Sequence, residues 1–132
     1  MMNDLEVEKL YRLGRTLGNG TFAVVRQAKC LRDSTKWAIK IIKRHALSLD
    51  DEESLKMEIA ILRQVVHPNI ISIKEVFYCV DNVFLVTELM TGGELFDRIV
   101  TKDHYSEREA KLALSDIVIA VHYCHTNNIV HR

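Results

Sequence analysis

The chain has 132 residues, of which 48% are hydrophobic and 27% charged, so it holds enough apolar material for one globular core. Lysine plus arginine and aspartate plus glutamate balance at 18 each, which leaves no net field to attract nucleic acid or an anionic membrane. These values exclude partners recognised through overall charge. Any anion that binds must be held by a local group of residues.

Cysteine usage and the start of the chain bear on the cellular compartment. The three cysteines are an odd number and lie far apart with no CxxC pair, which argues against a disulfide framework or a structural zinc site. The first residues lack the apolar run of a signal peptide, and no stretch reaches the ~18 apolar residues of a membrane span. We therefore expect an intracellular protein, cytoplasmic or nuclear, that contacts neither membrane nor nucleic acid.

Five segments have the composition and turn boundaries of strands, and a sixth has helical periodicity. The expected strands are 11–17, 23–30, 37–43, 70–78 and 83–89. Between the third and fourth strands, Leu55, Ile59 and Leu62 recur at helical spacing behind an acidic start, which predicts a helix over 50–66. The order predicts a five-stranded antiparallel sheet with one helix.

The chain becomes helical after Gly93. We expect a short helix over 94–100 and a long one that starts at the capping box formed by Ser106 and Glu109 and runs to about Thr126. The fold class is therefore α+β. A lead over 1–10 precedes the sheet and its helix over 11–90, and two helices over 91–132 begin an incomplete helical part.

A glycine-rich turn, Gly18-Asn19-Gly20-Thr21, joins the first two strands. A dinucleotide-binding fingerprint would join a strand to a helix, so this context does not fit one. Glycines let a backbone approach phosphate oxygens and present N–H groups to them. Taken alone, the turn is either an ordinary hairpin connection or a phosphate-covering loop.

A lysine and a glutamate carry unexpected charges on predicted core-facing surfaces. Strand alternation places Lys40 on one face with Ala38 and Ile42, and helical spacing places Glu58 beside the apolar stripe. A buried ammonium needs a partner, so we expect the two groups to form an ion pair that directs the lysine toward phosphate oxygens. The alternative is an extended surface lysine and a solvated glutamate.

Together these motifs resemble the protein kinase family in order and spacing. The run over 92–110 is most similar to the calcium/calmodulin-dependent group, and the resemblance covers nearly the whole chain from Tyr11. It corresponds to the first, ATP-binding half of the family's domain, so 11–90 resembles the kinase N-lobe and 91–132 the start of the C-lobe. The matching motifs are LGNGTFAVV, WAIK, Glu58, HPN, VTELMTGGELF and IVHR.

The resemblance implies ATP and Mg²⁺ as cofactors and transfer of the γ-phosphate to protein hydroxyls, in the manner of a serine/threonine kinase. Gly18, Asn19 and Gly20 match the loop that covers the ATP phosphates. Lys40 matches the lysine that contacts the phosphates, and Glu58 matches its ion-pair partner. Ala23 replaces the third loop glycine, so we expect a stiffer loop that still binds ATP.

Further positions match the family's nucleotide contacts. Three apolar side chains match residues that pack beside or over adenine: Leu17, Val25 and Ala38. Four more residues match the gatekeeper, the two hinge positions and an acid that touches ribose: Thr87, Glu88, Met90 and Glu94, in that order. In basophilic relatives this acid also contacts a substrate arginine, so the resemblance implies a protein substrate and allows one with basic residues.

The motif IVHR stops at Arg132, which matches the arginine before the family's catalytic aspartate. We expect the catalytic base and the metal ligands in a part that this sequence lacks, so no metal ligand is assigned here. The 132 residues alone are therefore expected to be catalytically inactive. We also expect them to bind MgATP weakly and to self-associate. Calcium or calmodulin regulation would be encoded elsewhere.

Two alternatives remain open, one for the function of the chain and one for a group of side chains on the last helix. A short product of a kinase gene could act as a non-catalytic binding or regulatory module in place of an enzyme. On the last helix, His122, Cys124 and His125 could in principle hold zinc, although a fourth ligand is missing. The simpler interpretation of this trio is a partly exposed helical face.

Overall fold

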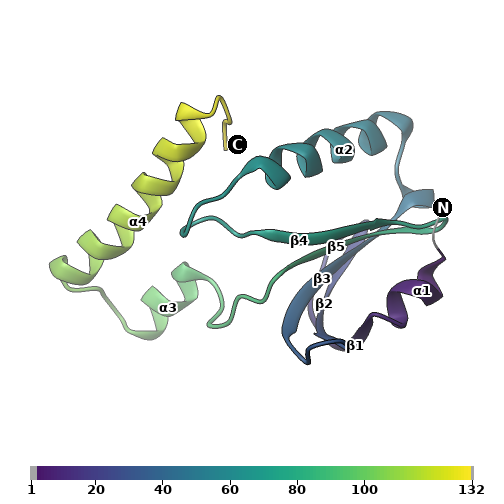
Figure 1. Ribbon diagram of the computed structural model, residues 1–132. Coiled ribbons are helices and arrows are strands. Elements are labelled where there is room, and N and C mark those ends of the chain that lie inside the picture. Colours follow the sequence, from purple (N-terminus) through teal and green to yellow (C-terminus); the bar gives the residue numbers. More distant parts are fainter. Residues whose placement is uncertain (1–2, 132) are drawn as a thin grey trace. The chain divides into compact units, whose positions relative to one another are not determined.

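The computed structural model describes residues 3–131 and divides into two compact units (Figure 1). The first unit contains the residues up to Gln64 together with Ser72–Leu89. The second contains Val65–Ile71 and the chain from Met90 onward. Arg132, on which the last motif match depends, lies outside the described residues.

The first unit is built on one five-stranded antiparallel sheet with the strand order β1-β2-β3-β5-β4, which confirms the predicted fold class. The first strand runs two residues further than predicted because Asn19 still pairs with Val24. The fourth begins later, because a turn with a bond from the Ile70 N–H to the His67 carbonyl precedes it. The strands are β1 Tyr11–Asn19, β2 Ala23–Cys30, β3 Lys36–Lys43, β4 Ile73–Tyr78 and β5 Asn82–Glu88.

The inner face of the sheet is covered by helix α2, Leu49–Gln64. The helix starts at Ser48, whose hydroxyl accepts a hydrogen bond from the Asp51 N–H at 3.1 Å. Its Ile59 is 2% exposed and packs with Ile42 and Leu85 of the sheet. The predicted helix over 50–66 is therefore confirmed in type, with an end two residues earlier.

The outer face is covered by a short helix that the sequence analysis did not assign, α1, Asp4–Glu8 (Figure 1). Its Val7 is 1% exposed and belongs to the buried cluster around Ile39 and Val86. Asp4 accepts a hydrogen bond of 2.5 Å from the Asn82 side chain, which ties the helix to the β4–β5 turn. The polar composition of this segment hid Val7, its one buried residue, which docks it.

Two further groups on the outer face are held by hydrogen bonds or burial. The Tyr11 hydroxyl donates a hydrogen bond of 2.7 Å to Glu75. Burial is the larger cause and this bond the smaller cause of a Tyr11 pKa raised well above its usual range. Burial raises the pKa of the Cys79 thiol to about 11. Both thiols in this cluster, Cys30 and Cys79, are free and buried, so the face forms a hydrophobic core.

The second unit contains two helices, α3 (Leu95–Thr101) and α4 (Glu107–Thr126). The predicted capping box is confirmed, since Ser106 and Glu109 bond reciprocally at the start of α4. Lys102 also donates a hydrogen bond to Glu109. This bond is the largest cause, and the Ser106 bonds are the next, of a Glu109 pKa lowered to about 2. None of the helices among the described residues has the length and apolar character needed to cross a membrane.

Within the second unit, the segment after α2 is anchored on α4. The Tyr123 hydroxyl accepts a bond of 3.1 Å from the Val66 N–H, and the Tyr123 ring lies 4.9 Å from the His67 ring. Several large apolar side chains on α4 are nevertheless exposed. They are Leu112, Leu114, Ile117, Val118, Ile119 and Val121.

Candidate functional site

The glycine-rich turn connects the first two strands at the free end of the hairpin. Its connection is closed by a bond of 2.8 Å from the Gly20 N–H to the Ala23 carbonyl. The Phe22 carbonyl accepts a bond of 3.0 Å from the Lys43 N–H, so the turn is fixed to the third strand as well. Gly18, Asn19 and Gly20 are all exposed. The predicted phosphate loop is thus a surface turn on a paired hairpin.

Strand register brings three of the predicted site residues into one row. Gly18 pairs with Val25, Val25 pairs with Lys40, and Lys40 pairs with Leu85. Directly paired residues of antiparallel strands project from the same face of the sheet. Because Leu85 belongs to the cluster that α2 covers, this is the inner face. The lysine therefore shares a face with the glycine turn.

A second row lies two residues along each strand and so faces the same way. Ala38, 7% exposed, pairs with Thr87. The Thr87 side chain is half-buried and bonds the Glu88 carbonyl at 3.4 Å. Leu17, just before the turn, is 40% exposed. Ala38 and Thr87 thus occupy a row adjacent to that of Gly18, Val25 and Lys40 on one surface.

Lys40 and Glu58 are not ion-paired within residues 3–131 of this structure. Both side chains are exposed, although Ile59, the next residue of α2, is buried. A solvated ammonium needs no partner, so the argument from burial does not apply here. Glu58 flanks the apolar stripe of α2, and the Lys40–Glu58 pair stays a prediction.

The five glycines of the chain fall into two groups. A Cβ on Gly14 would meet the Gln27 carbonyl oxygen at 3.3 Å, and Gly92 and Gly93 have φ of 110° and 74°, where other residues are strained. A Cβ on Gly18 would meet nothing within 4 Å, and one on Gly20 would make only an ordinary contact at 3.5 Å. Neither has a positive φ. The fold therefore requires glycine at Gly14, Gly92 and Gly93. It does not require glycine at Gly18 or Gly20, the two positions in the turn.

The remaining predicted residues lie at the end of β5 and beyond it. Glu88 is fixed to Ser72 by two bonds, including one of 2.6 Å from the Ser72 N–H to its carboxylate. Met90, which is 68% exposed, and Glu94, the residue that precedes α3, belong to the second unit. Both stay predictions from the resemblance.

Sequence reasoning missed Arg44, which anchors the helix that carries Glu58. Its guanidinium bonds Glu52 in the first turn of α2 at 2.5 and 3.0 Å and donates to the Cys79 carbonyl at 2.9 Å. Its N–H also bonds the Asp81 carbonyl at 2.9 Å. Arg44 lies in the short 3₁₀ helix η1, Arg44–Ala46. An arginine just before an acidic helix start was the available signal.

The structure gives no support to a metal site in the part of the chain that it describes. Residues 3–131 contain no group of three or more histidine, cysteine, aspartate or glutamate side chains placed to hold a metal ion. His122, Cys124 and His125 of α4 lie within these residues, so the zinc alternative gains no geometric basis.

Comparison with known proteins shows the family. Residues 11–132 match the protein kinase domain, and the chain belongs to the protein kinase family. It is 48% identical over 127 residues to myosin light chain kinase A of Dictyostelium discoideum, covering 96% of this chain and 43% of that protein. The predicted family is thereby confirmed.

The relatives also show the group within the family. Calcium/calmodulin-dependent protein kinase type I of Schizosaccharomyces pombe is 44% identical over 92% of this chain and 37% of its own length. Calcium/calmodulin-dependent protein kinase type IV of Mus musculus is 44% identical over 88% of this chain and 24% of its own length. In this part of its sequence the chain is similar to serine/threonine kinases of the calcium/calmodulin-dependent group. It spans less than half the length of these relatives.

Proposed function

We propose that this chain is the ATP-binding portion of a serine/threonine protein kinase that transfers the γ-phosphate of ATP to protein hydroxyls. The observation that carries the proposal is the pair of turn glycines without a role in folding. Gly18 and Gly20 need neither a left-handed backbone nor close packing, so the reason left for glycine is close approach of a ligand. Lys40 lies in the same row of the sheet as Gly18.

The residues of the inner face fit a nucleotide by their chemistry. The open space at Gly18 lets phosphate oxygens approach the backbone, and the Lys40 ammonium, which is exposed on the same face, supplies a positive charge. Val25 and Ala38 offer an apolar surface for a base. Mg²⁺, when bound with the nucleotide, neutralises charge on the phosphates; we assign its protein ligands to no residue of this chain.

Glu58, Glu88, Met90 and Glu94 have roles that rest on the family resemblance alone. We propose that Glu58 pairs with Lys40 when nucleotide is bound, and that the other three contact adenine or ribose. Arg44 supports this function indirectly, because it fixes the start of the helix that carries Glu58. We infer that these 132 residues on their own do not transfer phosphate, since no general base for the acceptor hydroxyl is assigned among them.

The proposal also covers the cellular compartment, the substrate and the regulation of the kinase. The free, buried thiols Cys30 and Cys79 suit a reducing intracellular compartment. The exposed apolar side chains of α4 suit a helix that further protein covers. We propose a protein substrate, with basic residues near the acceptor hydroxyl as a possible preference, and regulation by calcium and calmodulin as the names of two relatives suggest.

The test is phosphate transfer by the protein as isolated from its source cells, with all the residues it carries there. Transfer of labelled γ-phosphate to a mixed protein substrate should fall roughly a hundredfold or more in Lys40→Met, because a preorganised charge on the phosphates is lost. The matched control is Lys36→Met, which removes the same charge from an exposed position of β3.

Two outcomes would contradict the proposal. Equal activity of Lys40→Met and the unmodified protein would show that the lysine has no role at the phosphates. Equal loss in Lys36→Met would show that the effect is one of general charge. An isolated protein of 15.2 kDa without transfer activity would favour the binding-module alternative.

A further inference from the structure

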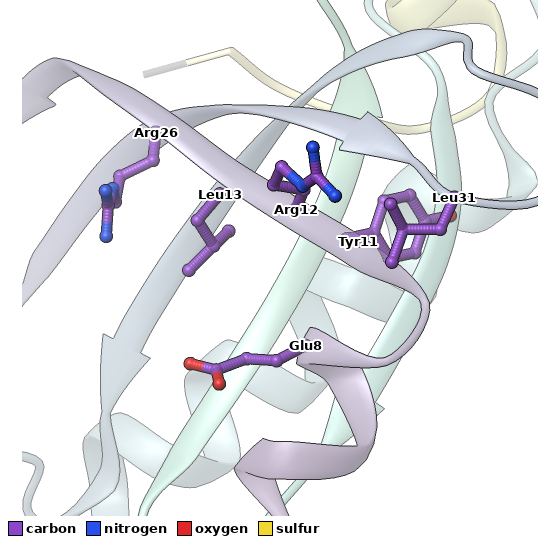
Figure 2. Close-up of a pocket in the computed structure, with 6 residues that line it drawn as sticks. All are labelled: Glu8, Tyr11, Arg12, Leu13, Arg26 and Leu31. Atoms are coloured by element: carbon purple, nitrogen blue, oxygen red, sulfur yellow. The ribbon is translucent and has the colours of Figure 1, made fainter.

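A pocket lies outside the residues assigned to ATP. It has a volume of about 410 Å³ and lies where the end of α1 meets the β1–β2 hairpin (Figure 2). Its six lining residues are Glu8, Tyr11, Arg12, Leu13, Arg26 and Leu31. None of them belongs to the predicted nucleotide site, so this pocket needs a separate explanation.

The surroundings of the pocket are strongly basic in a chain that is neutral as a whole. Residues 8–33 contain six lysines and arginines against two acids, Glu8 and Asp33. The second acid accepts a hydrogen bond of 2.5 Å from the Thr35 hydroxyl and does not line the pocket. The basic residues are Lys9, Arg12, Arg15, Arg26, Lys29 and Arg32. The local excess of positive charge favours an anionic partner.

The two arginines of the pocket differ in how they are held. The guanidinium of Arg26 donates two bonds, of 3.0 and 2.7 Å, to the Gly14 carbonyl, which fixes its position against β1. Arg12 is exposed, and within residues 3–131 its side chain makes no hydrogen bond or ion pair. Leu31 is 44% exposed and Leu13 is half-buried. The pocket thus joins one available guanidinium to an apolar floor.

The strand that carries Arg12 is also an edge of the sheet. In the described sheet β1 has β2 as its single neighbour, so its other side can accept an extended segment. We propose that this pocket docks an extended acidic peptide of a partner protein. A carboxylate of the peptide pairs with Arg12, and an adjacent apolar side chain packs on Leu13 and Leu31. The other basic residues of 8–33 set the preference for a short acidic run over a single charge.

The experiment uses a fluorescein-labelled peptide of alternating aspartate and valine, a composition that favours an extended chain. Fluorescence anisotropy with the 132-residue chain should show saturable binding. A peptide with asparagine in place of each aspartate should not bind detectably at the same concentrations. Anionic phosphatidylserine vesicles serve as competitor, because a basic surface also attracts membranes.

Matched variants separate the pocket from general charge. Arg12→Gln should weaken peptide binding roughly fivefold, the size of an exposed guanidinium–carboxylate contact. Arg15→Gln removes the same charge from an exposed position of the same strand outside the pocket, and should change binding less than about twofold. Leu31→Ser should weaken binding, whereas Leu5→Ser, at a 61% exposed position outside the pocket, should not.

Each other outcome overturns the proposal. Absence of saturable binding removes the site. Equal weakening by Arg12→Gln and Arg15→Gln reduces the effect to non-specific attraction. Displacement of the peptide by vesicles, with tighter binding to the vesicles, identifies the surface as a membrane-binding one. Circular dichroism of each variant confirms that the fold is retained, and all four positions are exposed, so folding is not expected to change.

Discussion

The two faces of the sheet perform opposite tasks although they share every strand. On the outer face, Ile39 and Val86 are fully buried beneath α1, and the Tyr11 hydroxyl is satisfied by Glu75. On the inner face, α2 covers the cluster around Leu85, while Lys40 remains exposed next to the glycine turn. Ile39 and Lys40 are neighbours in sequence. Both faces thus carry a buried cluster, but the proposed nucleotide contacts lie on the inner face alone.

This division depends on strand alternation and therefore on register. A shift of β3 by one residue would place Ile39 on the inner face and Lys40 in the buried cluster. The outer core resists this, because it would have to bury an ammonium without a partner. The buried face thus fixes the direction in which the functional face points. Substitutions on the two faces should accordingly differ in kind.

The largest effect is expected for Ile39→Ala. The side chain is fully buried, so the substitution leaves a cavity and should lower the free energy of unfolding by about 2–5 kcal/mol. Urea unfolding followed by the fluorescence of Trp37, the single tryptophan, measures it. Ile41→Ala, at a half-buried position of the same face, should cost less. A loss below about 1 kcal/mol for Ile39→Ala would contradict a closed outer core.

A smaller effect is expected for Tyr11→Phe. The hydroxyl donates to a carboxylate inside the outer face, and its loss leaves Glu75 without that donor. The free energy of unfolding should fall by roughly 1.5–3 kcal/mol, the range for hydrogen bonds to charged groups. Tyr105→Phe is the control, because the hydroxyl of Tyr105 is not hydrogen-bonded in the described part of the chain. Equal stability of both variants would show that the bond contributes nothing.

The same tyrosine predicts a limit at alkaline pH. Burial, and then the bond to Glu75, raises the folded-state pKa of Tyr11 above its ordinary value of 10.0. The folded chain therefore holds the phenolic proton more tightly than the unfolded chain. This stability is fully present below pH 10 and is lost as the pH rises above it toward the folded-state pKa. Titration of tyrosine absorbance should show one of the four tyrosines ionising only with unfolding.

Most elements could be predicted from periodicity and turn residues, but their contacts could not. The alternation in β3 and the spacing in α2 are strong local signals, and the Ser106 capping box fixed the start of α4. Helix α1 was missed because its five residues include one buried side chain, Val7, and docking decides its structure. Arg44 was missed because one of its partners, the Cys79 carbonyl, lies 35 residues away in sequence.

The candidate site was predictable in composition and only partly in geometry. Glycine, lysine and apolar positions followed from motif and alternation, and the register places Gly18, Val25 and Lys40 in one row. The expected bond between Lys40 and Glu58 relied on burial of both groups. Exposure of a side chain depends on everything packed around it, which a strand pattern does not contain.

Gly18→Ala should stabilise slightly. The added Cβ meets nothing within 4 Å, and it restricts the unfolded chain, which raises the free energy of unfolding by about 0.4–1 kcal/mol. Gly14→Ala is the matched contrast, because its Cβ would press on a backbone carbonyl at 3.3 Å and should destabilise. In the intact kinase, Gly18→Ala should raise the KM for ATP. A destabilised Gly18→Ala would indicate that the fold needs this glycine, and would remove the observation on which the proposed function rests.

The smallest effect on stability is expected for Lys40→Met. An exposed ammonium without an ion pair contributes little, so the free energy of unfolding should change by less than about 0.5 kcal/mol. The same substitution is expected to remove phosphate transfer, and this contrast with Ile39→Ala separates the two faces most sharply. A loss above about 1 kcal/mol would mean that the lysine is paired in solution. Glu58→Gln should then cost as much, and the double variant no more than either single one, because both substitutions would remove the same interaction.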